Sequence, residues 1–444
     1  MNEQLLLSYY GDDLTGSTDV MESLSLYGLP NVLFLRQPDS AQLARFDHCR
    51  AVGLAGTSRS QTPAWMEQHL PSALEWLRAL DAAICHYKVC STFDSAPHVG
   101  SIGKALDIGH DLFGQAVTPV VVGAPQLRRY TAFGHLFAAV HGVVHRIDRH
   151  PVMSRHPVTP MLESDLRRHL GLQTRKSIAL ADFTVLKSAD TDEQIDRLIA
   201  GGAEALLLDV LDHPSQCEVG RQLWRTRGEH GRFVVGSSGL EYALLQEWTR
   251  LGMIPGRVSY PDAGPVDRIA VVSGSCSEVT AGQIAWAETN GFAALPLDAR
   301  ELGQADTCEA AIGVATNSGI GALRGGRSVV FFSARGPDNL VAHAEADPDF
   351  RHRIGRSLGR ILRNLIQAER LSRVVVAGGD TSSHALAELD IHALTIRMPL
   401  AETPGSPLCL AHSDTPAFNG LEIALKGGQI GSRAYFGAIR DGRG

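Results

Sequence analysis

Short apolar runs alternate with helix-like segments along almost the whole of this 444-residue chain. The runs are rich in Val, Ile and Leu, which is typical of buried strands, and between them apolar residues recur at helical spacing. Strands are expected at 5–10, 31–36, 51–56, 82–88, 118–124, 177–183, 204–211, 232–237, 268–273, 292–297, 328–333, 373–378 and 392–397. Helices are expected between them, for example at 65–79, 192–200, 216–228, 239–252, 279–290 and 354–370. This alternation predicts the α/β class, in which mainly parallel sheets are flanked by helices.

One stretch interrupts the alternation. Residues 252–268, GMIPGRVSYPDAGPVDR, hold three prolines and three glycines and show no periodicity. Such a composition is typical of a linker. We therefore expect an N-terminal domain at 1–255, a linker at 256–267 and a C-terminal domain at 268–444, with an interdomain cleft.

The composition, with 44% hydrophobic and 20% charged residues, is that of an ordinary globular protein. A net charge of −7 argues against a nucleic-acid partner, which would favour a basic surface. No apolar run reaches about 18 residues, so no membrane span is expected. The seven cysteines form no C-x-x-C pair, which excludes a zinc ribbon and favours the cytoplasm. We expect no metal site built by the chain alone, and a homodimer is compatible with the pattern.

The loops after the expected strands carry the candidate chemistry, because ligands of parallel sheets bind outside the carboxyl ends of the strands. In the N-terminal half these loops hold charges of both signs, namely Asp12 and Asp13 in GDDLTGSTD, Arg59, and Lys88. A guanidinium or ammonium group binds a carboxylate, while Asp side chains accept hydrogen bonds from hydroxyls. This half therefore suits a small polyhydroxylated anion.

The loops of the C-terminal half are rich in Gly and Ser instead. They are GSCS at 274–277, GGDTSS at 378–383 and KGGQIG at 426–431. Backbone N–H groups at the start of a helix form an anion site that suits phosphates. Each such loop alone is equally well a simple helix cap. Loops rich in Gly, Ser, Thr and Asp also follow the expected strands at 118–124 and 232–237, and together these loops predict two polar sites, one in each domain.

Common nucleotide and hydrolase motifs are absent. GSIGKA at 100–105 does not have P-loop spacing, and GIGALRG at 319–325 is one residue off the dinucleotide fingerprint. No G-x-S-x-G elbow occurs. The loops alone leave open a kinase, an NAD(P)-dependent dehydrogenase or aldolase-like enzyme, and a non-catalytic sugar-acid-binding protein.

Several motifs occur together in a fixed order. They are GDDLTGSTD, KVCSTFDS, R-x-x-x-x-GHLF, SRHPVTPM, GSSGL, GSCS and GGDTSS. With them the chain resembles the four-carbon acid sugar kinase family throughout its length. The resemblance implies an N-terminal acid-sugar-binding domain and a C-terminal nucleotide-binding domain. It also implies transfer of the γ-phosphoryl group of ATP, with Mg²⁺, to a hydroxyl of a small sugar acid such as a threonate, an erythronate or a 3-oxo-tetronate.

The resemblance also implies roles for single residues. Asp13, or Asp12 beside it, would orient the acceptor hydroxyl and take its proton. Contacts to the sugar acid are implied for Arg59, Lys88, Ser91, Asp94, Arg129 and His156. Contacts to the nucleotide are implied for Ser275, Ser277, Gly378, Gly379, Asp380, Thr381, Lys426 and Gly428.

Two loops depart from the usual family pattern. Asp380 stands where the family more often has Glu, Ser383 stands in place of a Gly, and KGGQ replaces K-S-G-N. These variants are similar to the subgroup that acts on 3-oxo-isoapionate, a branched sugar acid.

Overall fold

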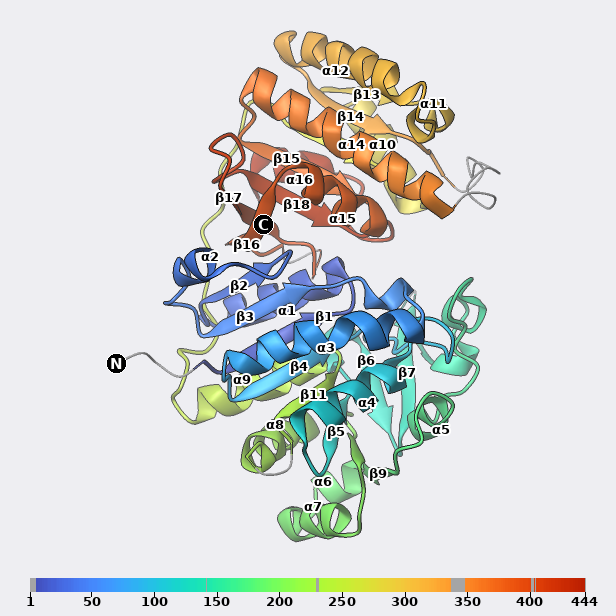
Figure 1. Ribbon diagram of the computed structural model, residues 1–444, viewed down its shortest axis with the longest axis vertical. Coiled ribbons are helices and arrows are strands. Elements are labelled where there is room, and N and C mark those ends of the chain that lie inside the picture. Colours follow the sequence, from blue (N-terminus) through green and yellow to red (C-terminus); the bar gives the residue numbers. More distant parts are fainter. Residues whose placement is uncertain are drawn as a thin grey trace. The chain divides into compact units, whose positions relative to one another are not determined.

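The structure, a computed structural model, describes residues 5–443 except 141, 229–230, 337–347, 401–402 and 404. The side chains of 348, 349, 351, 380, 381 and 383 also lie outside the description. The chain divides into two units, Met1–Val258 and Ser259–Gly444. In each unit a sheet is covered by helices on both faces (Figure 1). The prediction of an α/β fold with two mainly parallel, helix-flanked sheets is confirmed.

The first unit is built on strands that pair in parallel, in the order β2-β3-β1-β4-β11-β5-β10-β9. They are β1 (Leu7–Gly11), β2 (Asn31–Phe34), β3 (Ala51–Ala55), β4 (Ile84–Lys88), β5 (Thr118–Val121), β9 (Ile178–Ala181), β10 (Ala205–Leu208) and β11 (Phe233–Gly236). Their sequences are continuous apolar runs because both faces of a parallel sheet are buried.

The helices of this unit lie on the two faces of the sheet (Figure 1). Helices α3 and α4 pack together on one face, and α1, α8 and α9 lie on the other (Figure 1). The helices are α1 (Leu14–Leu26), α2 (Ser40–Ala44), α3 (Pro63–Ala79), α4 (Ile102–Phe113), α5 (Leu166–Gly171), α6 (Phe183–Leu186), α7 (Thr191–Ala200), α8 (His213–Thr226) and α9 (Gly239–Arg250).

A small antiparallel sheet follows β5 and is not predicted by the apolar pattern. Its strands are β6 (Arg129–Ala132), β7 (His135–Val140) and β8 (Val143–Arg146). Strand β8 is mostly exposed and carries His and Arg, so no apolar run marks it. The sheet matters for the site because it begins with Arg129.

The second unit has a parallel sheet with an antiparallel extension, in the order β13-β14-β12-β15-β18-β17-β16. Its strands are β12 (Ala270–Ser273), β13 (Phe292–Pro296), β14 (Ser328–Phe332), β15 (Arg373–Ala377), β16 (Ile391–Met398), β17 (Leu408–Ser413) and β18 (Glu422–Lys426). Its helices are α10 (Glu278–Glu288), α11 (Ala299–Gly303), α12 (Cys308–Arg324), α14 (Pro348–Glu369), α15 (Gly379–Glu388) and α16 (Tyr435–Asp441).

The near-fingerprint GIGALRG occupies the end of α12 rather than a turn between strand and helix. It is therefore part of a helix that packs against α14, and it forms no dinucleotide loop.

The register of the central strands fixes which loops meet. In the first unit Gly11 pairs with both Ala55 and Lys88, so β1, β3 and β4 end at one level. In the second unit Ala377 pairs with both Ser273 and Lys426, so β12, β15 and β18 also end together. Each sheet thus brings three of the expected loops to one edge.

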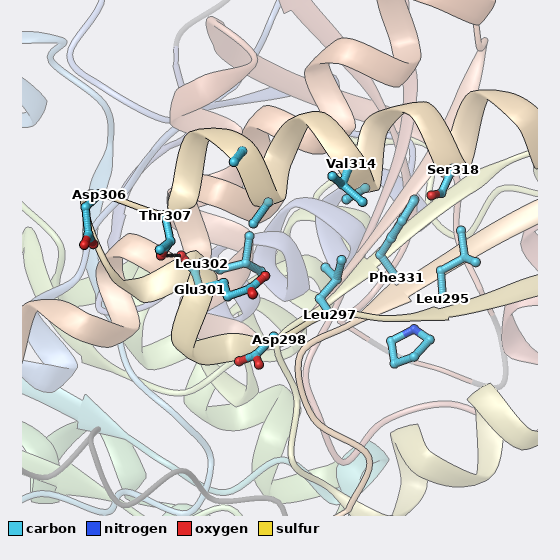
Figure 2. Close-up of a pocket in the computed structure, with 14 residues that line it drawn as sticks. Leu295, Leu297, Asp298, Glu301, Leu302, Asp306, Thr307, Val314, Ser318 and Phe331 are labelled. Atoms are coloured by element: carbon cyan, nitrogen blue, oxygen red, sulfur yellow. Dashed lines mark hydrogen bonds between the residues drawn. The ribbon is translucent and has the colours of Figure 1, made fainter.

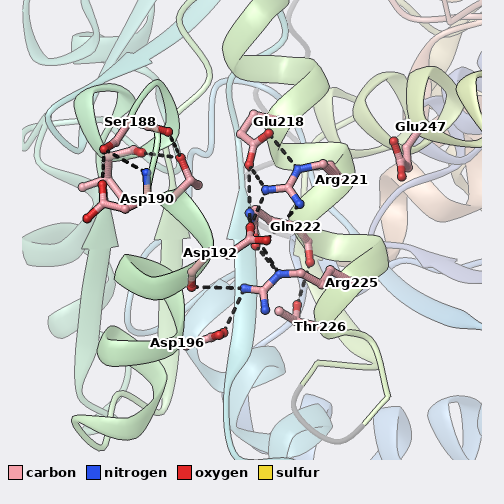
Figure 3. A network of polar contacts seen from close by, with 12 residues as sticks. Ser188, Asp190, Asp192, Asp196, Glu218, Arg221, Gln222, Arg225, Thr226 and Glu247 are labelled. Atoms are coloured by element: carbon pink, nitrogen blue, oxygen red, sulfur yellow. Dashed lines mark hydrogen bonds and ion pairs between the residues drawn. The ribbon is translucent and has the colours of Figure 1, made fainter.

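A polar network joins α7 to α8 on the surface of the first unit (Figure 3). Arg221 donates to Asp192 and to Glu218, and Arg225 donates to Asp196 at 2.9 Å. Exposed ion pairs of this kind contribute little to stability, typically below about 1 kcal/mol. The network therefore offers arginines whose removal serves as a control for changes at the buried site.

Candidate active site

Arg59 lies between two carboxylates in the first unit. It sits in the short turn after β3, where its Nη1 donates to Asp13 Oδ2 at 2.9 Å. Its Nη2 donates to both carboxylate oxygens of Asp94 at 3.1 Å. The other oxygen of Asp13 caps helix α1 by accepting from the N–H of Gly16. Three loops from different strands are therefore tied together by one guanidinium group.

Asp94 is the most heavily bonded member of this cluster. It is 5% exposed, and it accepts from Thr92 at 2.5 Å and from Thr159 at 2.9 Å. Burial raises the pKa of Asp94. The charge of Arg59 and the hydrogen bonds from the two hydroxyls lower it by more, so the net shift is downward. Asp94 is therefore an anion that orients Arg59.

His156 joins the cluster through Thr159. The Nδ1 of His156 lies 3.0 Å from Thr159 Oγ1 and accepts from the Thr159 N–H at 3.1 Å. Nδ1 is thus the unprotonated nitrogen, and any proton on the neutral ring is at Nε2. His156 is thus linked to Arg59 through Thr159 and Asp94.

Asp12 differs from its neighbours because burial outweighs the nearby positive charges of Arg59 and Lys88. It is 5% exposed, and among the described residues its Oδ1 has no hydrogen-bond partner. Its backbone is held by two hydrogen bonds: the Asp12 N–H donates to the Lys88 carbonyl at 2.9 Å, and the Arg59 N–H donates to the Asp12 carbonyl at 3.1 Å. Burial, and then the charge of Asp13, raise the pKa of Asp12 to about 7. Asp12 can therefore exchange a proton near neutral pH.

Lys88 ends strand β4 and is 2% exposed. Its Nζ lies 3.5 Å from Asp19 Oδ2, in helix α1. Burial lowers the pKa of Lys88, but the charges of Asp19 and Glu241 raise it above its ordinary value overall. Lys88 is thus a buried, permanently charged ammonium beside Asp12.

Arg129 and Ser91 lie at the margin of the cluster. Arg129 Nη1 donates to the carbonyls of Leu127 and Ala139, at 3.1 and 3.2 Å, and burial lowers the pKa of Arg129. The Nε of Arg129 is buried without a partner in the described part of the chain. Ser91 is half-buried on the loop that holds Asp94. Neither side chain contacts Arg59.

In the second unit, the loop after β12 meets the loop after β18. Ser277 caps α10 by accepting from the Thr280 N–H, and its hydroxyl donates to the carbonyl of Gly428. Ser275 Oγ lies 3.3 Å from Ser277 Oγ. A Cβ on Gly428 would lie 2.6 Å from Ser275 Oγ, so a larger residue there would displace the Ser275 hydroxyl.

Lys426 lies beneath these two loops. It is 1% exposed, and its Nζ donates to Thr280 Oγ1 at 3.0 Å and to the Gly427 carbonyl at 2.9 Å. Within the described ranges no carboxylate pairs with Lys426, and burial lowers its pKa to about 8. Such an ammonium favours an anion as its missing partner.

The third loop of this edge is the start of α15. Gly378 has φ +120°, which glycine adopts without strain, and its N–H donates to the Lys426 carbonyl at 2.8 Å. A Cβ on Gly379 would meet open space. Asp380 and Thr381 belong to the first turn of α15, but their side chains lie outside the described residues.

Three polar residues of the two sites are missing from the sequence prediction: Asp19, Thr159 and Thr280. Each lies within or directly beside a motif already singled out, in GDDLTGSTD, SRHPVTPM and GSCSEVT. Their roles depend on a helical turn or on a distant partner, as with the contact of Thr159 to Asp94. Only the folded geometry reveals such pairs.

Two further properties of the described residues concern metal ions and membranes. No group of three or more His, Cys, Asp or Glu is arranged to hold a metal ion in the part of the chain that the structure covers. Across the same residues, no helix has both the length and the apolar character needed to span a membrane.

Each of the two units matches a known protein family. Residues 7–244 match a family described as a sugar-binding N-terminal domain, and residues 270–436 match a nucleotide-binding C-terminal domain. A Paraburkholderia graminis protein named 3-oxo-isoapionate kinase is 48% identical, over 99% of this chain and 95% of the relative. A Cupriavidus necator protein named 3-oxo-tetronate kinase is 29% identical, over 97% and 95%.

Solved structures share the fold. One from Salmonella typhimurium LT2 aligns with a TM-score of 0.77 and 25% identity, over 98% of each chain. A Haemophilus influenzae protein of the family DUF1537 aligns with a TM-score of 0.73 and 23% identity, over 98% of this chain and 99% of that one. Since the two domain matches follow the two units and the curated relatives span nearly the whole chain, this chain belongs to the four-carbon acid sugar kinase family.

Proposed function

We propose that the protein is an ATP-dependent kinase that phosphorylates a hydroxyl of a small sugar acid, with 3-oxo-isoapionate as its substrate. The Paraburkholderia graminis relative that bears this name is 48% identical along nearly the full chain. The relatives at lower identity are named for 3-oxo-tetronate, which is also a 3-oxo sugar acid. Relatives of both names therefore support a 3-oxo sugar acid as the class of substrate, and the relative at 48% identity supports 3-oxo-isoapionate itself.

One observation carries the proposal: each unit contains a buried charged group whose pKa burial shifts toward the neutral form. In the first unit it is the carboxylate of Asp12, and in the second it is the ammonium of Lys426. A buried charge without a partner is costly, by several kcal/mol or more. A hydroxyl that donates to Asp12 and a phosphate that pairs with Lys426 would each remove that cost.

The sugar acid is assigned to the cluster around Arg59. Arg59 and Lys88 supply the positive charge for its carboxylate, and Asp94 holds Arg59 in place. Asp13 is already engaged with Arg59 and with the start of α1. Asp12 has a free oxygen and a pKa of about 7, so we assign to Asp12 the acceptance of the hydroxyl proton.

The nucleotide phosphates are assigned to the edge formed by Ser275, Ser277, Gly378, Gly428 and Lys426. The starts of α10 and α15 and the Lys426 ammonium suit anionic oxygens. Mg²⁺ is usually held by substrate phosphates together with only one or two carboxylates, which fits a chain without a metal cluster among its described residues. When bound, Mg²⁺ would supply charge neutralisation at the phosphates.

Transfer itself is mainly a matter of position, because the attacking oxygen must come to within about 3–3.5 Å of phosphorus. Both domains of the chain are needed for such a reaction, since the sugar acid and the nucleotide are assigned to different units. The proposal includes exclusion of water during transfer, which limits loss of ATP to hydrolysis.

The direct test is consumption of ATP in the presence of different sugar acids. We expect turnover with 3-oxo-isoapionate, weaker turnover with 3-oxo-tetronate and the least with D-threonate, each measured as ADP formed with Mg²⁺ present. Reactions without an acid, and reactions of Lys426→Met, are the controls. ADP formation that does not depend on any of these acids would contradict the proposal.

Replacing Arg59 by Ala is expected to raise the KM for the sugar acid about tenfold to hundredfold, because charged hydrogen bonds contribute about 1.5–3 kcal/mol. The KM for ATP should stay within twofold of the parent value. Arg225→Ala removes the same charge from α8 of the same unit and should change neither constant. An increase confined to the KM for ATP would indicate that Arg59 binds the nucleotide and would contradict its assignment to the sugar acid.

Replacing Asp12 by Asn is expected to lower kcat by about 10²-fold or more, with ATP affinity unchanged, because a general base is lost. The same change should stabilise the fold at high pH. The folded parent keeps the Asp12 proton up to about pH 7, whereas an unfolded Asp loses it near pH 4. The parent is therefore progressively destabilised between those values.

Melting temperatures of the parent and of Asp12→Asn, measured at pH 5 and pH 8, check this expectation. The variant should melt at a higher temperature than the parent, and this difference in melting temperature should be larger at pH 8 than at pH 5. Normal turnover by the variant, or an advantage that does not vary with pH, would remove Asp12 from the role assigned to it.

A further inference from the structure

Carboxylates from three separate elements surround the buried Lys88. Its Nζ lies 3.5 Å from Asp19 Oδ2 of α1, and the charges of Glu241 on α9 and of Asp12 after β1 act on it as well. Cys90, on the loop after β4, is a further titratable group that faces it. The pairing of Lys88 with the carboxylate of a sugar acid accounts for its positive charge, but not for the three negative charges around it.

An acidic surface elsewhere in the chain has a different composition. A cavity of about 470 Å³ beside β13 is lined by Asp298, Glu301 and Asp306 together with apolar side chains. Figure 2 shows these carboxylates along α11 and in the turn before α12. No Lys or Arg is among the described residues that line this cavity. The carboxylates of the first unit differ because they are gathered around an amine, whose reactivity they control.

A second buried residue, His86, holds Glu241 in place. His86 and Lys88 are two positions apart on β4, so both side chains point to the same face of the sheet. One oxygen of Glu241 bonds to His86 Nδ1, and His86 Nε2 donates to the Gly236 carbonyl at 3.0 Å. The side chains of His86 and Glu241 are both fully buried. Glu241 therefore cannot turn away from this face without breaking a buried hydrogen bond.

The Lys88 ammonium borders the same small space as the proposed base. A Cβ on Gly16 would lie 3.3 Å from Lys88 Nζ and 3.8 Å from Asp12 Oδ1. It would also lie 2.8 Å from Asp13 Oδ1. Because residue 16 is a glycine, the ammonium and the two carboxylates surround an open volume. A hydroxyl that reaches Asp12 there brings the rest of a small acid beside Lys88.

A lysine in such a place can react with a 3-oxo acid, whose ketone lies two bonds from its carboxyl carbon. A neutral amine attacks the ketone, a C–N bond forms, and the carbonyl oxygen leaves as water with the two amine protons, which gives an imine. Once the imine is protonated, the C1–C2 bond breaks, its electron pair moves toward nitrogen, and carbon dioxide leaves. The resulting enamine takes a proton at C2, and water then releases the ketone and the lysine. Burial alone promotes this route, because desolvation disfavours the ammonium.

We propose that Asp19 and Glu241 keep Lys88 an ammonium, so that the protein binds a 3-oxo acid without capturing it as an imine and decarboxylating it. The proposal rests on the function proposed above, which brings the ketone beside Lys88. An ammonium has no lone pair for the attack, yet it still pairs with the carboxylate of the substrate. Burial lowers the pKa of Lys88, and the neighbouring negative charges raise it by more. Asp19 and Glu241 act through Lys88 and are positioning residues.

Imine formation is tested without ATP, by incubating the protein with 3-oxo-isoapionate and cyanoborohydride, which adds hydride to an iminium carbon. Mass spectrometry of the peptide that contains Lys88 measures the adduct. We expect Asp19→Asn to form it at least tenfold faster than the parent, and to release carbon dioxide from the acid when the reductant is omitted. Glu247→Gln removes a carboxylate of α9 that pairs with Arg250 at 2.7 Å, and it should behave as the parent does.

Glu241→Gln is a second variant that preserves the buried hydrogen bonds. The new amide donates to Nδ1 of a neutral His86, while Nε2 still donates to the Gly236 carbonyl. We expect this variant also to form the adduct at least tenfold faster than the parent. Adding Lys88→Met to Asp19→Asn should abolish the adduct, because the attacking amine is then absent.

Three results would overturn the proposal. They are adduct formation by the parent as fast as by both variants, no adduct in either variant, and an adduct that persists when Lys88→Met is added. The kinase proposal is tested separately, because the adduct assay contains no ATP. A parent protein that forms no ADP with any 3-oxo acid would contradict the kinase proposal itself.

Discussion

Desolvation of charged side chains at the carboxyl ends of the strands is the constraint on which the rest of the structure depends. Moving an ion from water into the protein costs several kcal/mol unless a partner compensates for it. The first unit compensates Arg59 with Asp13 and Asp94, and Lys88 with Asp19. For Asp12 the charges of Arg59 and Lys88 do not offset burial and the charge of Asp13, and its pKa rises to about 7 as a result. Where the protein does not provide a partner, a ligand gains affinity by providing one.

The two units apply this constraint with opposite signs. The first keeps the Asp12 carboxylate buried, with one oxygen that has no hydrogen-bond partner among the described residues, which suits an anionic ligand whose hydroxyl gives up a proton. The second keeps the Lys426 ammonium among hydroxyls and carbonyls, beside two helix starts, which suits phosphate oxygens. Parallel strands that end at one level make both arrangements possible, because their register brings three loops to one edge. The function thus follows from charges that the fold alone does not satisfy.

Much of this architecture is predictable from the sequence, since parallel strands such as β1, β12 and β15 are continuous apolar runs. Because these runs mark where each strand ends, the loops that follow can be located, and with them Asp12, Arg59, Lys88 and the Gly-rich turns. The sheet of β6, β7 and β8 escapes prediction because its strands are half-exposed and mixed in polarity.

Contacts between distant residues are the other part that the sequence does not reveal. The bond from Thr159 to Asp94 spans 65 positions, and the contact of Ser277 with Gly428 spans 151. No local spacing encodes such pairs. The difference between Asp12 and Asp13 is likewise invisible in the sequence, because it depends on which carboxylate Arg59 reaches. The cavity beside β13 also arises only when α11 and α12 are folded against that strand.

The pKa of Asp12 tests the central claim most directly. It can be measured in the ligand-free protein by carbon-13 NMR of labelled aspartate carboxyl groups, with the Asp12→Asn variant to assign the signal. The account predicts a titration midpoint near 7, well above that of an ordinary aspartate. A midpoint near 4 would show that the Asp12 carboxylate is already compensated, and it would contradict the account.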